Sequence, residues 1–247
     1  MSDDLDVSVV IRVVDMERNL KILLEDRLPK QSIKPRDIVV VDNFSNKEEK
    51  DLVGDYISRL DVGMPIVFVP ISEFSHPYSL NIGIERAEGE FVATINGHCD
   101  ILNRHWLELG RRHLADPEVA AVGGYYVSTR EGSIWETICF TLPVRVATLA
   151  GYIVENGPIS TVNAIIRKEV WEEVPFDVGL VDYGIKECED WIWSKRVIER
   201  GYKTVLDPAL SLIHFHGYSF RELYEKLRLW RWYCRRFETL RAMKIIQ

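Results

Sequence analysis

The chain has 247 residues, of which 47% are hydrophobic and 28% charged, so it can bury a sizeable core and does not have the composition of a disordered protein. Its apolar runs are far shorter than the roughly 20 residues that cross a bilayer, and its acidic start lacks the basic segment of a secretion signal. We therefore expect an intracellular, cytoplasmic protein. The four cysteines lie far apart without a Cys-x-x-Cys pair, which argues against a zinc ribbon or a disulfide scaffold.

Charge is distributed unevenly along the chain. From residue 220 onward eight Lys or Arg stand against three Glu, so a formal net charge of -7 leaves -12 on residues 1–219. An acidic body of this kind is not typical of a nucleic-acid binder. The basic end is a candidate for contact with an anionic surface.

The first half of the chain alternates buried strands with helices. Residues 7–13 (VSVVIRV) are β-branched and almost all apolar, which predicts a parallel strand covered on both faces. Asp15 is predicted to cap a helix that carries four leucines between residues 20 and 28 and ends at Pro29. A charged helix is expected after residue 46, and another at 78–87. Three further strands are predicted at 37–42 (DIVVVD), 64–70 (MPIVFVP) and 90–96 (EFVATIN).

The second half is less regular. Strands are predicted at 120–127, 161–167 and in the short segments KTVLDP and LSLIHFHG, with a poorly periodic stretch at 133–158. Residues 187–202 predict a helix, and 220–243 predict a long amphipathic one. The alternation predicts a single α/β domain with a doubly wound mixed sheet over residues 1–219, followed by a basic amphipathic helix within 220–247. Ligands of such sheets bind beyond the carboxyl ends of the strands.

Several of these segments together resemble glycosyltransferase family 2, whose members have the GT-A fold and transfer sugar from a nucleotide-sugar donor, often in polysaccharide biosynthesis. VSVVIRVVDMERNL and IVVVDNFSN resemble the first two strands of the family. SLNIGIERAEGEFVATINGHCD resembles the Asn-x-Gly helix and the strand that bears the Asp-x-Asp element. FD followed by ECEDWIWSKRVIERGYKTVLDP resembles the acceptor-side segment. The resemblance extends from residue 7 to about residue 220.

The chain departs from the family at its most diagnostic element. Asn96-Gly97-His98 stands where most relatives have Asp-x-Asp. Imidazole is a good ligand for Mn²⁺, and some GT-A enzymes carry Asp-x-His, so His98 is a candidate metal ligand. Asn96 supplies only a neutral oxygen and would hold a hard cation less tightly than a carboxylate. Asp100 could restore the charge, but a surface or turn position is the simpler interpretation.

Donor binding is predicted at the ends of the first two strands. By the resemblance, Asp42 accepts a hydrogen bond from a base N–H of the nucleotide, although capping of a turn is a common role for Asp at such a place. The other residues expected near the donor are Val13, Asp15, Asn43, Ser45, Asn81, Asn96 and Gly97. The family often has a basic residue before the Asn of its Asn-x-Gly helix, whereas here Leu80 precedes Asn81. His76 is a candidate substitute for that phosphate contact.

A divalent cation, Mn²⁺ or Mg²⁺, is expected to stabilise the departing diphosphate. Beside His98, the segment His214-Phe215-His216 offers two imidazoles, which alternate along a predicted strand and therefore face one side. Relatives often carry a metal-binding His here. We favour His216, nearest the turn at Gly217, and a packed, hydrogen-bonded role is equally compatible with His214.

The general base is predicted at the start of the helix that follows residue 187. Glu189 and Asp190 lie at its amino end, where the helix dipole keeps carboxylates ionised. Neighbours on a helix point about 100° apart, so one of the two faces the acceptor. By the resemblance we assign Asp190 as the base and Glu189 to acceptor binding or orientation. Without the resemblance, a simple helix-dipole role would be favoured. Trp191 is the candidate acceptor platform, and packing is the alternative.

These features predict an inverting glycosyltransferase that uses a UDP-, dTDP- or GDP-linked sugar and a glycan or lipid-linked acceptor. Inversion is implied by the family and agrees with a single base. The alternative is a degenerate relative that binds nucleotide sugar or glycan without turnover, because Asn96 has weakened the metal site. A nucleotidyltransferase ranks below both, since no Gly-rich basic loop follows the first strand. The last helix could contact the inner face of a membrane, a second copy of the chain, or its own domain.

Overall fold

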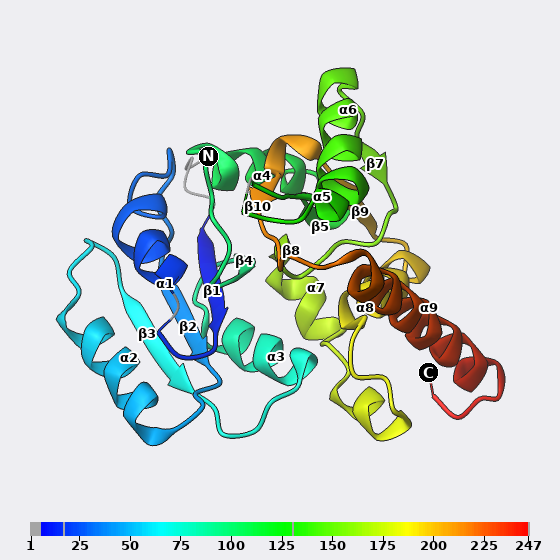
Figure 1. Cartoon of the computed structure of the whole chain (residues 1–247), viewed down its shortest axis with the longest axis horizontal. Coiled ribbons are helices and arrows are strands. Elements are labelled where there is room, and N and C mark those ends of the chain that lie inside the picture. Colours follow the sequence, from blue (N-terminus) through cyan, green and yellow to red (C-terminus); the bar gives the residue numbers. More distant parts are fainter. Residues whose placement is uncertain (1–5, 17, 130, 247) are drawn as a thin grey trace.

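The computed structural model describes residues 6–16, 18–129 and 131–246 and contains one large mixed sheet (Figure 1). Eight strands form it in the order β3-β2-β1-β4-β8-β5-β9-β7. Their bounds are β1 Val7–Val13, β2 Ile38–Asp42, β3 Ile66–Pro70, β4 Phe91–Asn96, β5 Val119–Gly123, β7 Val154–Glu155, β8 Asn163–Arg167 and β9 Lys203–Leu206. A second sheet pairs β6 Tyr126–Val127 with β10 Leu212–Ile213 in parallel.

The first four strands form the parallel half of the sheet. β1 lies between β2 and β4, and β3 pairs with β2, all in parallel. Every residue of β1 and β2 is buried, as expected for strands covered on both faces. The carboxyl ends of these strands share one edge, which places Arg12 of β1 opposite Asn96 of β4.

The second half of the sheet is mixed because β8 runs antiparallel between β4 and β5. β5 pairs with β9 in parallel, and the short β7 closes this side antiparallel to β9. β5 therefore runs in the same direction as β4, and its carboxyl end leads to the same edge of the sheet. The doubly wound mixed α/β sheet predicted from the sequence is confirmed.

Helices cover both faces of the sheet. One face packs against α1 Arg18–Ile22, the π-helical turn η1 Leu23–Arg27, α2 Lys47–Arg59 and α4 Trp106–Leu114. The other packs against α3 His76–Arg86, α7 Lys168–Glu173 and α8 Glu189–Glu199. Two helices approach the sheet at glycines. A Cβ on Gly83 of α3 would lie 2.5 Å from a Val10 methyl, and one on Gly110 of α4 would overlap Ile165 of β8.

The long basic helix α9 spans Phe220–Ala242, close to the prediction. Its buried residues Tyr233, Phe237 and Leu240 pack with Ile192 of α8, with Leu180 of the 3₁₀ turn η3 Val178–Tyr183 and with Ile185 between them. One face of α9 thus packs on its own domain. Among the described residues, no helix combines the length and apolar character needed to span a membrane.

Two local predictions are wrong. Asp15 does not cap a helix; it has a φ of 60°, and its carboxylate accepts hydrogen bonds from Ser45. The strand predicted through His214 and His216 ends at Ile213. The poorly periodic stretch 133–158, for which the sequence predicted no element, forms α5 Ile134–Glu136, the π-helical turn η2 Thr137–Thr141, α6 Leu142–Ala150 and β7. Its apolar residues lie all around α6, so no single face repeats in the sequence.

Candidate functional site

A cavity of about 540 Å³ lies at the carboxyl edge of the sheet. It gathers residues from β1, from the segment after β4, from the start of α8 and from the segment after β10, which are distant in sequence. The side chains most relevant to chemistry are Arg12, His98, Glu189, Asp190, His214 and His216. The imidazole at 98 and the carboxylate at 190 therefore face one cavity.

His98 is placed by the turn that ends β4. The Gly97 amide donates to the Arg12 carbonyl at 2.7 Å, and the Cys99 amide donates to the Asn96 carbonyl at 3.0 Å. The side-chain NH₂ group of Asn19 donates a hydrogen bond to the His98 carbonyl at 2.8 Å. These bonds fix the backbone on both sides of His98, while its ring stays half-buried and faces the cavity.

His214 and His216 are brought to His98 by Asp100. The backbones of Asp100 and Ile213 exchange two hydrogen bonds of 3.0 and 2.9 Å, which join the segment after β4 to β10. The Asp100 carboxylate is also bound by Arg27, with Nε–Oδ1 and Nη2–Oδ2 distances of 2.5 and 3.0 Å. Its side chain is only 18% exposed, so Asp100 is an anchor rather than a surface turn residue.

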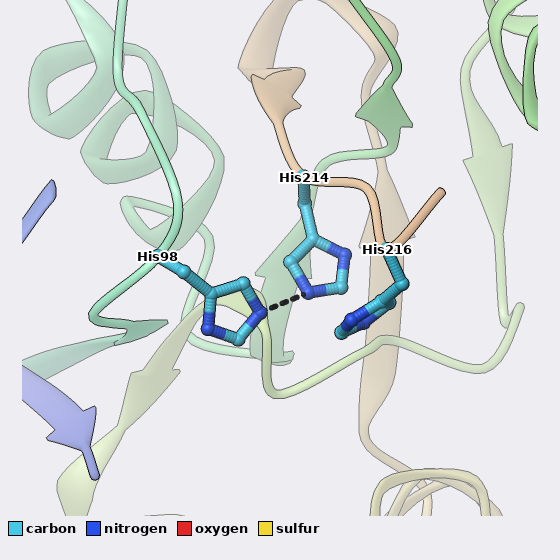
Figure 2. A group of neighbouring side chains, drawn as sticks. All are labelled: His98, His214 and His216. Carbon is cyan, nitrogen blue, oxygen red and sulfur yellow. Dashed lines mark hydrogen bonds between the residues drawn. The ribbon is translucent and has the colours of Figure 1, made fainter. Parts of the chain in front are cut away.

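Figure 2 shows the three imidazoles converging from two separate segments of the chain. The Nε2 atoms of His98 and His214 are 2.9 Å apart, and the candidate ligand atoms of all three rings lie within 4.8 Å of one another. Burial, with help from the other two imidazoles, lowers the pKa of His214 to about 3, and burial likewise lowers the pKa of His216. Neutral rings keep a lone pair, which is the form that binds a metal.

This donor set fits a divalent cation. Two imidazole nitrogens 2.9 Å apart are close to the spacing of adjacent ligands on one ion, for which metal–nitrogen bonds are about 2.1 Å. Imidazole suits transition-metal ions better than Mg²⁺, which prefers oxygen ligands. His214, whose role the sequence left open, therefore belongs to the cluster together with His98 and His216.

The side chain of Asn96 is hydrogen-bonded to the buried guanidinium of Arg12. The Arg12 Nη2 donates to Asn96 Oδ1 at 3.0 Å, and Arg12 is only 8% exposed. Its Nε has no hydrogen-bond partner among the described residues. Burial lowers the pKa of Arg12, while the charges of Glu189 and Asp190 oppose that shift. The cavity thus has a fixed positive charge beside Asn96.

The carboxylate pair opens α8 directly after a strained residue. Cys188, the N-cap, has a φ of 74°, which is uncommon outside glycine. Glu189 accepts a hydrogen bond from the Thr161 hydroxyl at 3.2 Å. Asp190 accepts one from the Trp191 amide at 2.7 Å and a longer one of 3.4 Å from the Thr161 amide.

Both carboxyls are harder to ionise than usual. Burial, together with the charge of Glu189, raises the pKa of Asp190 from its ordinary value of 3.8 to about 7. Burial also raises the pKa of Glu189, against the attraction of Arg12. A carboxylate with a pKa near neutrality in a cavity has the property required of a general base.

The two tryptophans that flank the pair differ in environment. Trp193 is 1% exposed, and its indole N–H donates to the Val174 carbonyl, so it is a packing residue. Trp191 lines the cavity and packs edge-on against Phe237 of α9, with a ring-centroid distance of 6.1 Å. Trp191 is therefore the one of the two that a bound molecule could touch.

The residues predicted for donor binding lie at the same edge of the sheet but mostly outside this cavity. Asn96 lines it, whereas the residues at the ends of β1 and β2 (Val13, Asp15, Asp42, Asn43 and Ser45) and Gly97 do not belong to its described lining. Asp42 is fully buried, and its Oδ1 accepts the Asp15 amide at 3.0 Å. The Asn43 amide donates to the Val13 carbonyl. These bonds tie the two loops together.

Asn81 serves a structural role. Its side-chain oxygen accepts hydrogen bonds from the Trp171 indole and the Phe176 amide, and its NH₂ group donates to the Phe176 carbonyl at 2.7 Å. His76 does line the cavity, with Nδ1 3.4 Å from Arg12 Nη1. Burial, and secondly the charge of Arg12, lowers the pKa of His76 to about 4, which favours a neutral ring that can offer a hydrogen bond rather than a charge.

Sequence reasoning missed Arg12, Glu136 and Glu187. Glu136 is 1% exposed and accepts the backbone amides of His216 and Gly217 at 2.8 and 3.0 Å. Glu187 accepts hydrogen bonds from Lys226 and from the Trp230 indole of α9, each at 2.7 Å. For Arg12 the sequence did contain a signal, because an Arg within a largely apolar strand is unusual. Nothing local in the sequence marks the two glutamates.

Comparisons with known proteins agree with this geometry. A family model described as Glycosyl transferase family 2 matches residues 8–174. The O-antigen chain rhamnosyltransferase WbaN of Salmonella anatum is 24% identical over 205 residues, which cover 80% of this chain and 62% of that protein.

Solved structures show the same fold. The mannosyltransferase PcManGT from Pyrobaculum calidifontis, in complex with GDP-Man and Mn²⁺, superposes with a TM-score of 0.60 at 21% identity, over 84% of this chain and 56% of that one. GalNAc-T7 with UDP, GalNAc and Mn²⁺ gives a TM-score of 0.67 at 16% identity, over 92% of this chain and 48% of that one. The chain thus spans about half to three fifths of these proteins. The likeness confirms the predicted GT-A-like fold.

Proposed function

The chain belongs to glycosyltransferase family 2, and from this premise we propose that it transfers a sugar from a nucleoside-diphosphate sugar to a hydroxyl acceptor with inversion at the anomeric carbon. The observation that carries the proposal is the single cavity lined by the three imidazoles and by the Glu189-Asp190 pair. One group of residues suits a diphosphate with its cation, and the other suits proton removal.

On the donor side, His98, His214 and His216 would hold a divalent cation, for which their imidazoles favour Mn²⁺ over Mg²⁺. When bound, such an ion neutralises charge that develops on the leaving diphosphate. Arg12 adds a fixed positive charge in the same cavity, where its guanidinium would attract a phosphate oxygen. Together these groups compensate for the neutral Asn96.

We assign nucleotide binding to the joined loops after β1 and β2. Asp42 would accept a base N–H, with Val13, Asp15, Asn43 and Ser45 around the nucleoside and Asn96-Gly97 beside the diphosphate. The Asp15–Ser45 hydrogen bonds of 2.7 and 2.6 Å hold the two loops in one arrangement. Asn81 contributes indirectly, by fixing the segment at Phe176. UDP, dTDP and GDP are the candidate carriers.

On the acceptor side, Asp190 would take the proton from the attacking hydroxyl. Glu189 keeps Thr161 in place through its 3.2 Å hydrogen bond and raises the pKa of Asp190 through its charge. Trp191 would bind the acceptor sugar against its ring. Attack by the hydroxyl oxygen displaces the diphosphate from the opposite face of the sugar, which inverts the anomeric centre.

The proposed acceptor is a glycan or a lipid-linked saccharide, and the name of one relative supports a glycan. WbaN is named as an O-antigen chain rhamnosyltransferase, so a deoxyhexose donor and a growing polysaccharide are the first substrates to test.

We also propose that α9, the segment beyond the catalytic fold, mediates contact with the inner face of a membrane or with another copy of the chain. Its basic outward face is compatible with the former.

The rival function is binding of a nucleotide sugar without turnover. Calorimetry with UDP, GDP and dTDP, with and without Mn²⁺, would identify the carrier and the cation dependence. A donor hydrolysis and transfer assay on the same protein then separates the two functions. Binding of one nucleotide with measurable donor breakdown supports the transferase; binding with no breakdown for any sugar of that nucleotide supports the rival.

A further inference from the structure

An apolar protrusion stands beside the cavity, formed by α5, η2 and α6 and hereafter called the α6 knob (residues 133–153). In Figure 1, α6 projects from the body of the molecule at the top of the view. Its outward side chains are between 39% and 90% exposed. They are Ile134, Trp135, Ile138, Leu142, Val146, Leu149, Tyr152 and Ile153. A contiguous apolar surface of this kind is unusual on a protein that faces water alone.

The knob has very little charge. Between residues 137 and 153 the only charged side chain is Arg145, which is exposed. Glu136 is buried and holds the backbone at His216 and Gly217, so it does not contribute to the surface. Glu131 and Glu155 are exposed on the two flanks of the knob. The exposed helix surface itself is therefore apolar with one basic residue.

The knob continues into the outward face of α9. The ring of Trp135 lies against that of Phe220, the first residue of α9, with a centroid distance of 5.0 Å. Beyond Phe220 the outward face of α9 combines exposed apolar side chains with arginines: Tyr224, Leu227, Trp232, Arg221, Arg228, Arg231 and Arg235. Glu222 and Glu225 are the exposed acids on this helix, and the latter is paired with Arg221.

We propose that the α6 knob and the outward face of α9 dock together on a bilayer that contains anionic lipid. Aromatic and aliphatic side chains insert at the boundary between headgroups and acyl chains, and arginines bind the anionic headgroups. The acidic remainder of the chain, with a formal charge of -12 over residues 1–219, is repelled by the same surface. The charge distribution thus favours one orientation on the membrane.

The docking surface lies next to the catalytic cavity. A second cavity of about 430 Å³ lies beneath α6, with Pro143, Val144 and Ala147 of that helix in its wall. It shares Tyr126 and Phe140 with the catalytic cavity. An acceptor anchored in the bilayer by an apolar chain would therefore meet the site at the height of the membrane surface. Only this last consequence rests on the proposed function.

A second copy of the chain is a poorer occupant of the same surface. In a two-fold symmetric dimer the surface would pack against the same surface of the second copy, so a face that carries Arg145 and the arginines of α9 would meet another basic face. Like charges across an interface oppose association. An anionic headgroup layer neutralises these arginines while it accepts the apolar side chains.

Flotation of the full chain with phosphatidylcholine vesicles, with and without added phosphatidylglycerol, tests the proposal. We expect binding to the mixed vesicles and a loss of at least about tenfold in partition coefficient for Val146→Glu/Leu149→Glu, since two apolar contacts become charged. Leu52→Glu, a matched change at a 52% exposed leucine of α2, should leave the partition coefficient unchanged. Arg228→Glu/Arg231→Glu should lower binding to mixed vesicles and weaken its dependence on NaCl.

Vesicle binding is measured without substrate, so its outcome is independent of whether the chain transfers sugar. Absence of flotation by the wild-type chain would overturn the proposal, as would equal flotation of the α6 double variant that has wild-type circular dichroism. A concentration-dependent dimer in sedimentation that the same double variant abolishes, without vesicle binding, would instead assign the surface to a second copy.

Discussion

Replacing Asp190 by Asn tests the proposed base through two opposite effects. The substitution removes an ionisable carboxyl but keeps an oxygen that can accept the Trp191 amide. If Asp190 removes the acceptor proton, transfer falls by about 10²- to 10⁴-fold, while donor binding at the imidazole cluster persists. Burial and the charge of Glu189 disfavour the ionised carboxylate of Asp190. The same substitution should therefore make the fold more stable than that of wild type at alkaline pH.

The size of the second effect follows from the pKa shift. Burial and the charge of Glu189 raise the pKa of Asp190 from 3.8 to about 7, roughly three units at about 1.4 kcal/mol each. The side chain of Asp190 is partly exposed to solvent, which screens the effect, so we take about half of the total, on the order of 2 kcal/mol. Because the pKa of Asp190 is higher in the folded than in the unfolded chain, protonation of Asp190 stabilises the fold. This contribution to the free energy of unfolding is fully present below about pH 4 and is lost as the pH rises through about 7.

The assay compares wild type and Asp190→Asn in thermal unfolding at pH 5 and pH 8, beside transfer rates. About three fifths of this contribution is lost between pH 5 and pH 8, so relative to wild type the variant should gain about 3–5 °C in Tm over that interval, since 1 kcal/mol corresponds to about 2–4 °C for a chain of this size. Wild-type kcat/KM should rise with pH up to about 7. Undiminished transfer by the variant, or a variant that loses stability on going from pH 5 to pH 8 relative to wild type, would refute the reasoning.

Three further outcomes are expected. His98→Ala should abolish the Tm increase caused by Mn²⁺ with nucleoside diphosphate, whereas His105→Ala, away from the cluster, should retain it; equal responses would exclude His98 as a ligand. Arg12→Met should weaken nucleoside-diphosphate binding in calorimetry by about 10- to 100-fold, the loss expected for a charge-assisted hydrogen bond, and unchanged affinity would remove Arg12 from the site. Gly110→Ala should destabilise the fold by about 1–3 kcal/mol in urea because its Cβ overlaps β8, while Gly54→Ala should change stability by less than about 1 kcal/mol.

The parallel half of the fold was accessible from the sequence because its strands are buried on both faces. Residues 7–13 are β-branched except for Ser8 and Arg12, residues 38–41 are all β-branched, and such runs have few alternatives to a buried parallel strand. The start of α8 was predictable for a similar reason, since the Glu-Asp pair and the apolar spacing that follows are both local signals. The candidate base and His98 came from these segments.

The remaining parts of the site depend on contacts between distant segments. Asp100 joins the turn after β4 to Ile213, and Glu136 fixes the backbone of His216 from 80 positions away. No local pattern encodes such partners. His214 was left open because a strand pattern cannot tell a packed imidazole from a ligand, and its ring reaches His98 only after the chain has left β10.

The α6 knob was missed because sequence periodicity locates buried faces. Its apolar residues surround the helix instead of repeating on one side, so the segment had no preferred face in the sequence. The structure shows that many of these residues point outward, which is a property of the tertiary arrangement and not of the local pattern.

The central claim is that the imidazoles of His98, His214 and His216 bind one cation in the cavity that also holds Asp190. Anomalous scattering from a crystal grown with Mn²⁺ and the nucleoside diphosphate that binds in calorimetry measures this directly. We predict one manganese peak coordinated by nitrogens of all three rings, with the diphosphate on the side of the ion that faces Arg12. A peak held by other residues, or a diphosphate bound outside this cavity, would contradict the account.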